Sequence, residues 1–203
     1  KEQGRTENGM ENQKQEFRGL EAEEIAEVYE KRMKRDFPKS ELKPLTAIIH
    51  MWEKGSYDCL GFYEEDRMTA YAFSVKDPEK GYLLLDYLAV CEEWRGDGHG
   101  SRCLEELRRF YRQKKGILLE CESLESAKNE SEIALRTRRI RFYEKNGCVR
   151  SGVRSRVFGV DFEILYLPLS ERQVDVSGEL ERLYRLMLSE DRYERWVRIW
   201  DKE

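Results

Sequence analysis

The stretch from Tyr82 to Tyr111, YLLLDYLAVCEEWRGDGHGSRCLEELRRFY, most constrains how this chain can fold. Its first part, Tyr82–Val90, is apolar except for Asp86, and an unbroken apolar run of this length predicts a strand covered on both faces. A glycine loop, Arg95–Gly100, comes next, and a helix with apolar residues on one side follows it. The sequence therefore places a tight loop between a buried strand and a helix.

A glycine loop that opens a helix favours an anion, because the first helical N–H groups lack partners and the helix dipole is positive there. Two phosphate-binding patterns fail. A P-loop needs Lys and then Ser or Thr after its last glycine, and here Ser and Arg follow Gly100. A dinucleotide fingerprint needs G-x-G-x-x-G spacing, whereas Gly96, Gly98 and Gly100 are two residues apart. The pattern R-x-x-G-x-G, which begins at Arg95, remains.

Hydrophobic periodicity predicts strands and helices that alternate along the chain, and hence an α/β (α+β) protein. The expected strands are Gln15–Arg18, Tyr57–Tyr63, Met68–Val75, Tyr82–Val90, Ile117–Glu122, Cys148–Arg156 and Val157–Leu167. The expected helices begin near Ala22, Ser40, Ser101 and Asn129, and two further helical pieces follow Ser177, the second carrying Tyr193, Trp196, Val197 and Trp200.

A second motif, IRFYEKNGC at Ile140–Cys148, follows one strand after the glycine loop. With that loop, it resembles the GNAT (GCN5-related N-acetyltransferase) superfamily, whose late segment is F-Y-x-x-x-G-F. Three positions depart from the family pattern: Cys148 replaces a Phe, and Arg136 and Arg139 replace Asn and Ala. Over about Phe17–Leu167 the resemblance implies the GNAT fold, a mixed, mostly antiparallel sheet of about seven strands with flanking helices.

The chain divides into three expected parts. Residues 1–14 are polar and predict a disordered tail, residues 15–169 form the acetyltransferase domain, and residues 170–203 form a C-terminal helical extension. We expect the extension to pack on the domain; a homodimer contact and a lid over the substrate are the alternatives.

Composition excludes some classes of partner. The five cysteines are scattered, which argues against a metal site and favours reduced thiols in a cytoplasmic protein. No apolar run approaches the ~20 residues of a membrane helix, so no membrane partner is expected. A net charge of −4 gives no overall attraction to nucleic acid.

The resemblance implies acetyl-CoA as the co-substrate. In this family the strand before the glycine loop separates from the next strand, and pantetheine forms hydrogen bonds with the backbone of the first of these strands. By position, the residues that would pair with pantetheine here are Leu88, Ala89 and Val90. Backbone N–H groups of the loop would hold the pyrophosphate. The loop residues expected to contact it are Arg95, Gly96, Asp97, Gly98, His99, Gly100 and Ser101.

Amine attack on a thioester requires the amine to lose a proton and the departing thiolate to gain one. The resemblance assigns the acid to Tyr143, and the alternative is a core aromatic residue. Asp86 is one candidate base, because strand alternation places it on the face of Leu88 and Val90; the alternative is a structural carboxylate bonded to a neighbour. Glu120 is the other candidate, with a solvated strand end as its alternative. A water chain could also serve as the base.

The expected function is therefore an acetyl-CoA-dependent N-acetyltransferase, which transfers acetyl directly to an amine in a ternary complex. The acceptor is a small-molecule amine or a peptide amine, and the sequence carries no motif that identifies it. The alternative is a non-catalytic acyl-CoA-binding or regulatory module on the same fold.

Overall fold

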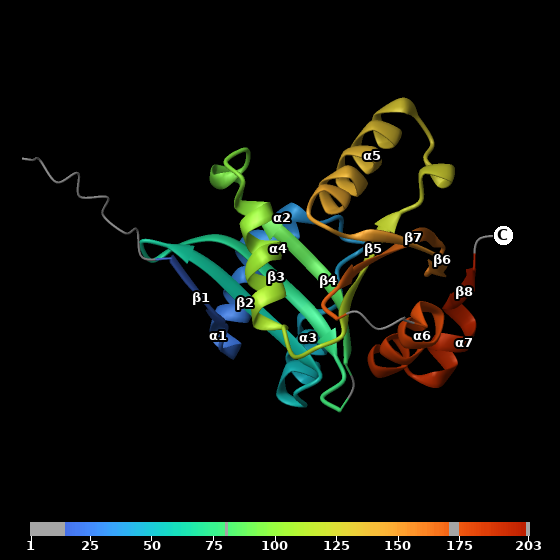
Figure 1. The fold of residues 1–203 in the computed structure, drawn as a ribbon. Coiled ribbons are helices and arrows are strands. Elements are labelled where there is room, and N and C mark those ends of the chain that lie inside the picture. The colour runs from blue at the N-terminus through green and yellow to red at the C-terminus, as the bar shows by residue number, and fades with distance from the viewer. Residues whose placement is uncertain (1–14, 80, 171–174, 202–203) are drawn as a thin grey trace, which may run out of the picture.

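The computed structural model describes residues 15–79, 81–170 and 175–201, so the tail expected at residues 1–14 lies outside the described part. The described strands form one eight-stranded sheet in the order β1-β2-β3-β4-β5-β7-β6-β8 (Figure 1). Within it, β4 and β5 run parallel and the other neighbours run antiparallel. The strands are β1 (Gln15–Gly19), β2 (Tyr57–Glu64), β3 (Arg67–Lys76), β4 (Tyr82–Val90), β5 (Gly116–Glu122), β6 (Val149–Val157), β7 (Val160–Pro168) and β8 (Val197–Asp201).

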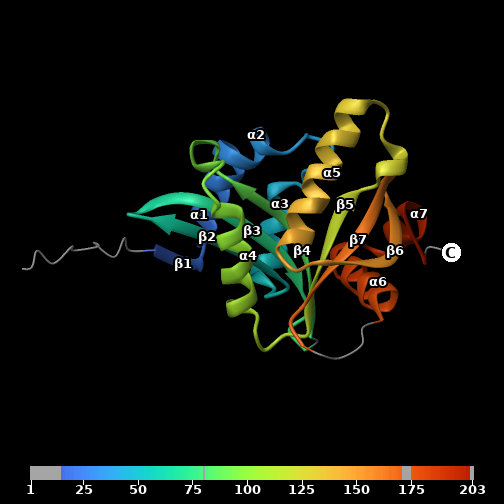
Figure 2. The ribbon, with the colours of Figure 1, turned by 45° about the horizontal axis from the view of Figure 1, so that its top comes forward.

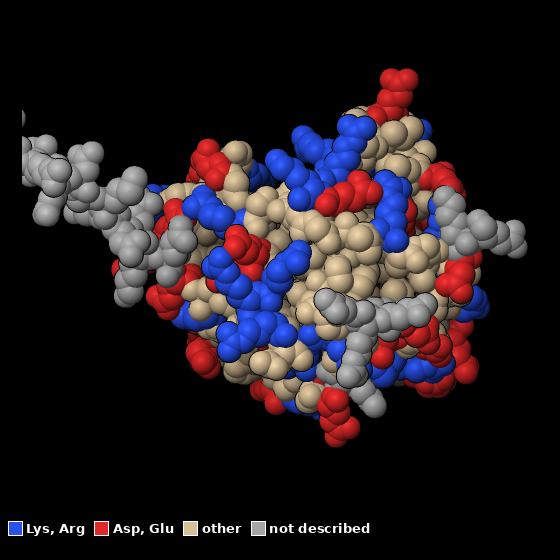
Figure 3. Space-filling model, in the orientation of Figure 1, with Lys and Arg blue, Asp and Glu red and all other residues tan. Residues whose placement is uncertain are grey.

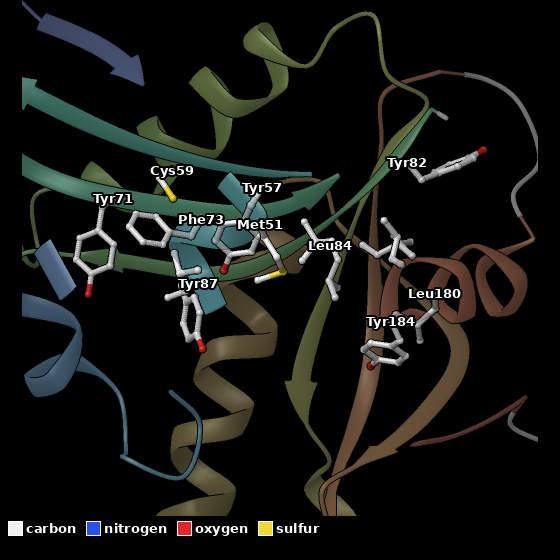
Figure 4. Close-up of a cluster of buried hydrophobic side chains, with 14 of the residues drawn as sticks. Met51, Tyr57, Cys59, Tyr71, Phe73, Tyr82, Leu84, Tyr87, Leu180 and Tyr184 are labelled. Carbon is white, nitrogen blue, oxygen red and sulfur yellow. The ribbon is translucent and has the colours of Figure 1, made fainter. Parts of the chain in front are cut away.

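Helices cover both faces of the sheet (Figures 1 and 2). They are α1 (Ala22–Val28), α2 (Lys34–Asp36), α3 (Leu45–Glu53), α4 (His99–Phe110), α5 (Glu130–Lys145), α6 (Val176–Met187) and α7 (Glu190–Trp196). Apolar side chains from α1, α3 and α6 pack on one face in a first core, part of which Figure 4 shows. Side chains from α4 and α5 pack on the other face in a second core.

Strand β5 contributes side chains to both cores, because successive side chains point to opposite faces of the sheet. Ile117, Leu119 and Cys121 belong to the second core, whereas Leu118 belongs to the first. Successive side chains of a strand point to opposite faces, so the next residue on the side of the first core is Glu120. A carboxylate is thereby placed at the edge of an apolar layer.

Several predicted elements are confirmed. The strand Tyr82–Val90 has the predicted bounds, and α5 begins after Asn129, whose side chain accepts a hydrogen bond from the Glu132 N–H at 2.9 Å. The α/β fold with helices on both faces of a mostly antiparallel sheet is confirmed as well.

The second helix starts later than predicted. We expected a helix from Ser40 with Pro44 in its first turn, but α3 begins at Leu45 and Pro44 precedes it in an extended conformation. A residue that precedes proline is disfavoured in the α region, so Lys43 cannot readily continue a helix into Pro44. The segment before α3 is therefore a loop.

The prediction of a helix through Trp200 was wrong. The second helix of the extension, α7, ends at Trp196, and Val197–Asp201 forms β8. This strand pairs antiparallel with β6, which places Val197 opposite Val157. The free edge of β6 offers backbone partners that outweigh the helical spacing of the aromatic residues, so the sheet has eight strands and not about seven.

A bulge in β4 overturns one prediction about Asp86. Two consecutive residues of β3, Phe73 and Ser74, pair with Tyr87 and Leu85 of β4. Asp86 lies between these two and has no partner in β3, so it is the extra residue of the bulge. Because the bulge reverses the alternation, Leu88 and Val90 pack against the second core, whereas Asp86 is bonded on the side of the first. Asp86 therefore does not share the face of Leu88 and Val90.

Candidate active site between β4 and β5

Strands β4 and β5 pair only over their first residues and then part (Figure 2). Their last pair is Leu85 with Leu119; beyond it, β4 continues with β3 to Val90, and β5 continues with β7 to Glu122. We call the separated ends, residues 86–90 and 120–122, the β4–β5 fork. Leu88, Ala89 and Val90 are half-buried, and β5 does not cover the backbone edge that they turn to it. An extended ligand can pair with such an edge.

The glycine loop lies just beyond the β4 arm of the fork. Gly96 and Gly98 have φ values of +102° and +80°, in the left-handed region that favours glycine, and Gly98 caps α4. The first turn of α4 therefore presents N–H groups without helical partners at the positive end of the helix dipole. Space at Gly100 is tight, because a Cβ there would lie 3.0 Å from the Phe142 ring.

Two side chains of the loop, those of Arg95 and His99, contact other parts of the protein. The Arg95 guanidinium donates to the Val90 carbonyl at 3.0 Å and to Asp36 at 3.0 Å, which ties the loop to the end of α2. The His99 imidazole is buried, with its ring centroid 5.0 Å from that of Trp94. An anion at this loop would therefore depend on backbone N–H groups, as at other helix N-termini.

Asp86 is held by two side chains at the apex of the fork. Lys43 donates to Oδ1 at 2.7 Å and Tyr57 donates to Oδ2 at 2.5 Å, and only 7% of the Asp86 side chain is exposed. Although burial disfavours its charge, Lys43 has a pKa above its usual value because of the Asp86 carboxylate. Both carboxylate oxygens of Asp86 are thus occupied.

Glu120 faces the same apex from β5. Its Oε1 accepts a hydrogen bond from the Tyr184 hydroxyl of α6, whereas Oε2 has no hydrogen-bond partner in the described part of the chain. Burial raises the pKa of Glu120 to about 7; the Asp86 charge acts in the same direction, and the Tyr184 hydrogen bond and the Lys43 charge oppose it. Burial therefore favours the protonated form of this carboxyl group.

Tyr143 approaches from the opposite face of the sheet. It lies on α5 and packs against the second core, as Leu88 and Val90 do. Burial raises the pKa of its hydroxyl above the usual value, with a smaller contribution from Cys121, so the group stays protonated at neutral pH. Within residues 15–79, 81–170 and 175–201 this hydroxyl has no hydrogen-bond partner.

The structure thus brings Asp86 and Glu120 to one side of the fork and places Tyr143 on the other. Glu122, next along the face of Glu120, is bonded to Arg136 at 3.0 Å, and Arg139 lies 3.6 Å from it. These arginines of α5 are accordingly paired with a carboxylate.

Sequence reasoning missed Lys43, Tyr57 and Tyr184 as members of the site. Tyr57 and Tyr184 lie among apolar residues, so the sequence pattern predicts only that they pack in the core. The hydrogen-bond partner of each hydroxyl comes from a distant segment of the chain, which the local pattern does not reveal. The proline after Lys43 was a usable signal, because it marks a loop that can carry this side chain to the fork.

No cluster of three or more potential metal ligands occurs among the residues that the structure describes. Likewise, none of the helices in these parts of the chain has the length and apolar character required to cross a membrane.

One protein-family model matches part of this chain. Residues 55–148 match the model of the acetyltransferase (GNAT) domain. This segment contains β4, the glycine loop, β5 and all of α5, so it includes the β4–β5 fork. A search of curated protein sequences found no match.

Solved structures share the fold. An acetyltransferase assigned to the GNAT family from Desulfovibrio desulfuricans aligns with a TM-score of 0.57 at 21% identity, over 77% of this chain and all of the other. The ribosomal-protein-S18-alanine N-acetyltransferase of Escherichia coli aligns with a TM-score of 0.54 at 19% identity, over 80% and 99%. Spermidine N-acetyltransferase of Vibrio cholerae, solved with CoA and spermine, aligns with a TM-score of 0.57 at 11% identity, over 77% and 96%.

Proposed function

We propose that this chain, of which residues 55–148 match the model of the acetyltransferase (GNAT) domain, is an acetyl-CoA-dependent N-acetyltransferase that transfers acetyl directly to an amine in a ternary complex. One observation carries the proposal: β4 and β5 part ahead of a glycine loop that opens α4, and the Glu120 carboxyl group lies where the two strands part. A thioester site and a proton acceptor are thus adjacent.

The fork and the loop fit the two polar parts of acetyl-CoA. The free edge of β4 at Leu88, Ala89 and Val90 suits the amide groups of pantetheine, and the N–H groups from Gly96 to Ser101 suit the pyrophosphate. A β4 N–H in the fork would also polarise the thioester carbonyl. Figure 3 shows Lys and Arg side chains gathered around α4 and α5 on this face, which favours an anionic nucleotide.

Glu120 is the base in this proposal and Tyr143 is the acid. Glu120 has a free Oε2 and is half ionised near pH 7, so it can accept the proton that the attacking amine must lose. Asp86 has both oxygens occupied, and we assign it the role of holding Lys43 and Tyr57 beside the base. Tyr143 keeps its proton at neutral pH and can give it to the departing thiolate.

The acceptor in this proposal is a small-molecule or peptide amine. Glu41, in the loop before α3, adds a fourth carboxyl group near the fork, after Asp86, Glu120 and Glu122; burial raises its pKa, and the charge of Glu122 does so to a smaller extent. Carboxylates around the base attract a protonated amine and lower its cost of desolvation.

An acetylation screen tests the proposal. Acetyl-CoA is incubated with the purified chain and a panel of polyamines, amino acids, aminoglycosides and peptides with free N-termini, and free CoA and products are measured by mass spectrometry. We expect at least one amine to be acetylated. Saturable acetyl-CoA binding without transfer to any class would instead indicate the acyl-CoA-binding module.

A further inference from the structure

The C-terminal extension reaches the reaction site. Helix α6 packs into the first core through Leu180, Leu183 and Tyr184, all 1% exposed or less, and Figure 4 shows Leu180 and Tyr184 within that core. Among these residues Tyr184 alone carries a polar atom. Its hydroxyl donates to Glu120 and also contacts the buried Ser155 hydroxyl of β6 at 3.1 Å.

We propose that Tyr184 is a positioning residue for Glu120, so that the C-terminal extension completes the acceptor side of the active site. This inference rests on the proposed function insofar as Glu120 is the base. It goes beyond the family model, which ends at residue 148, before the extension begins.

The hydrogen bonds of the Tyr184 hydroxyl show that this residue does more than fill space in the core. Burying a hydroxyl is unfavourable unless it is hydrogen-bonded, and a phenylalanine would fill the same space without that cost. Tyr184 is fixed from two sides, because α6 is packed into the core and Ser155 lies on β6. Its bond to Oε1 leaves Oε2 free, so one carboxylate oxygen is held and the other remains available to an amine.

The other groups around Glu120 are fixed as well. From β4 it faces Asp86, from the loop before α3 it faces Lys43, and from α6 it faces Tyr184. Asp86 and Lys43 form an ion pair with each other, and their charges shift the pKa of Glu120 in opposite directions. Of these three groups, the Tyr184 hydroxyl is the uncharged one, and it is hydrogen-bonded directly to Glu120.

Titration of Glu120 tests the inference without requiring catalysis. The chain is labelled with ¹³C-carboxyl glutamate, and the Glu120 NMR signal is assigned by its loss in Glu120→Gln. The chemical shift of this signal is then measured as a function of pH, which gives the titration midpoint. We expect a midpoint of about 7 in the unmodified chain. In Tyr184→Phe it should rise by about one pH unit, because a hydrogen bond to the ionised form is lost. An unchanged midpoint would overturn the positioning role.

Tyr111→Phe is the matched control. Tyr111 is also buried and donates to a carboxylate, Asp58, at 2.8 Å, but away from the fork. The Glu120 midpoint should not move in this variant. If Tyr184→Phe does not fold, Ser155→Ala replaces it; loss of the second partner of Tyr184 should raise the midpoint by a smaller amount, and no change would overturn the role.

The pH profile of kcat/KM for an accepted amine separates this inference from the proposed function. In Tyr184→Phe the acidic limb of this profile should move to higher pH by the same amount as the NMR midpoint. If the midpoint moves but no amine is acetylated by any variant, the positioning holds and the enzymatic function fails. If amines are acetylated and the limb stays in place, the function holds and the positioning role fails.

Discussion

At the scale of single residues, burial sets the protonation of the two groups that we place in the reaction. It raises the pKa of Glu120 to about 7, so this carboxyl can take up a proton near neutral pH, and it raises the pKa of Tyr143 so that the hydroxyl keeps its proton. In the proposed mechanism, burial thus prepares both the base and the acid, on opposite faces of the same sheet.

The raised pKa of Glu120 predicts how stability depends on pH. The contribution of this group is fully present below its ordinary value of 4.5 and is lost as the pH rises through about 7, because the folded state disfavours the charged form. Glu120→Gln should therefore gain stability relative to the unmodified chain between pH 4 and pH 8, by up to about 3 kcal/mol. Urea unfolding across this range measures the difference. A constant difference would show that Glu120 ionises normally.

Tyr143→Phe should lower turnover by about a hundredfold and leave acetyl-CoA affinity within about twofold, because only the proton for the leaving thiolate is lost. The hydroxyl has no partner in the described parts of the chain, so the substitution should hardly affect folding. Turnover and calorimetric affinity are measured on the same preparation. Unchanged turnover would remove Tyr143 from the mechanism.

At the scale of elements, the local features of the site were predictable and the long-range ones were not. The β4 bounds and the glycine loop follow from nearby residues, and so does the Asn129 cap of α5. The bulge at Asp86 depends on pairing with β3, and the hydrogen bond between Tyr184 and Glu120 joins residues 64 positions apart. No local pattern encodes such contacts, so sequence reasoning named Glu120 but not the tyrosine that holds it.

The glycine loop gives a prediction at this scale. Gly98→Val should weaken acetyl-CoA binding at least tenfold, because φ is +80° and a β-branched residue there would cost about 1–3 kcal/mol or shift the loop. Gly55→Val is the control, since Gly55 has a φ of +72° after α3 and an equally open environment. It should be destabilised to a similar extent and still bind. Equal affinity in both variants would contradict the proposed phosphate site.

At the scale of the whole molecule, the extension and the domain share one core. Side chains of α6 belong to the same cluster as Tyr57 of β2 and Tyr87 of β4, and β8 extends the sheet beyond β6. The predicted packing of the tail on the domain is therefore seen in the described residues, and we expect the two parts to unfold together.

Leu183→Ala tests this shared cooperativity. Leu183 is fully buried, so its truncation should cost about 2–5 kcal/mol. Hydrogen exchange measured by mass spectrometry should then speed up equally in α6 and in β4. Faster exchange confined to the extension would show that it unfolds separately and does not stabilise the site.

Calorimetric titration of acetyl-CoA into the purified chain tests most directly whether the β4–β5 fork and the loop before α4 form a thioester site. We predict saturable binding of one acetyl-CoA per chain with a sub-millimolar Kd, lost in Gly98→Val and kept in Gly55→Val. Absence of binding at sub-millimolar acetyl-CoA by the folded chain would contradict the assignment.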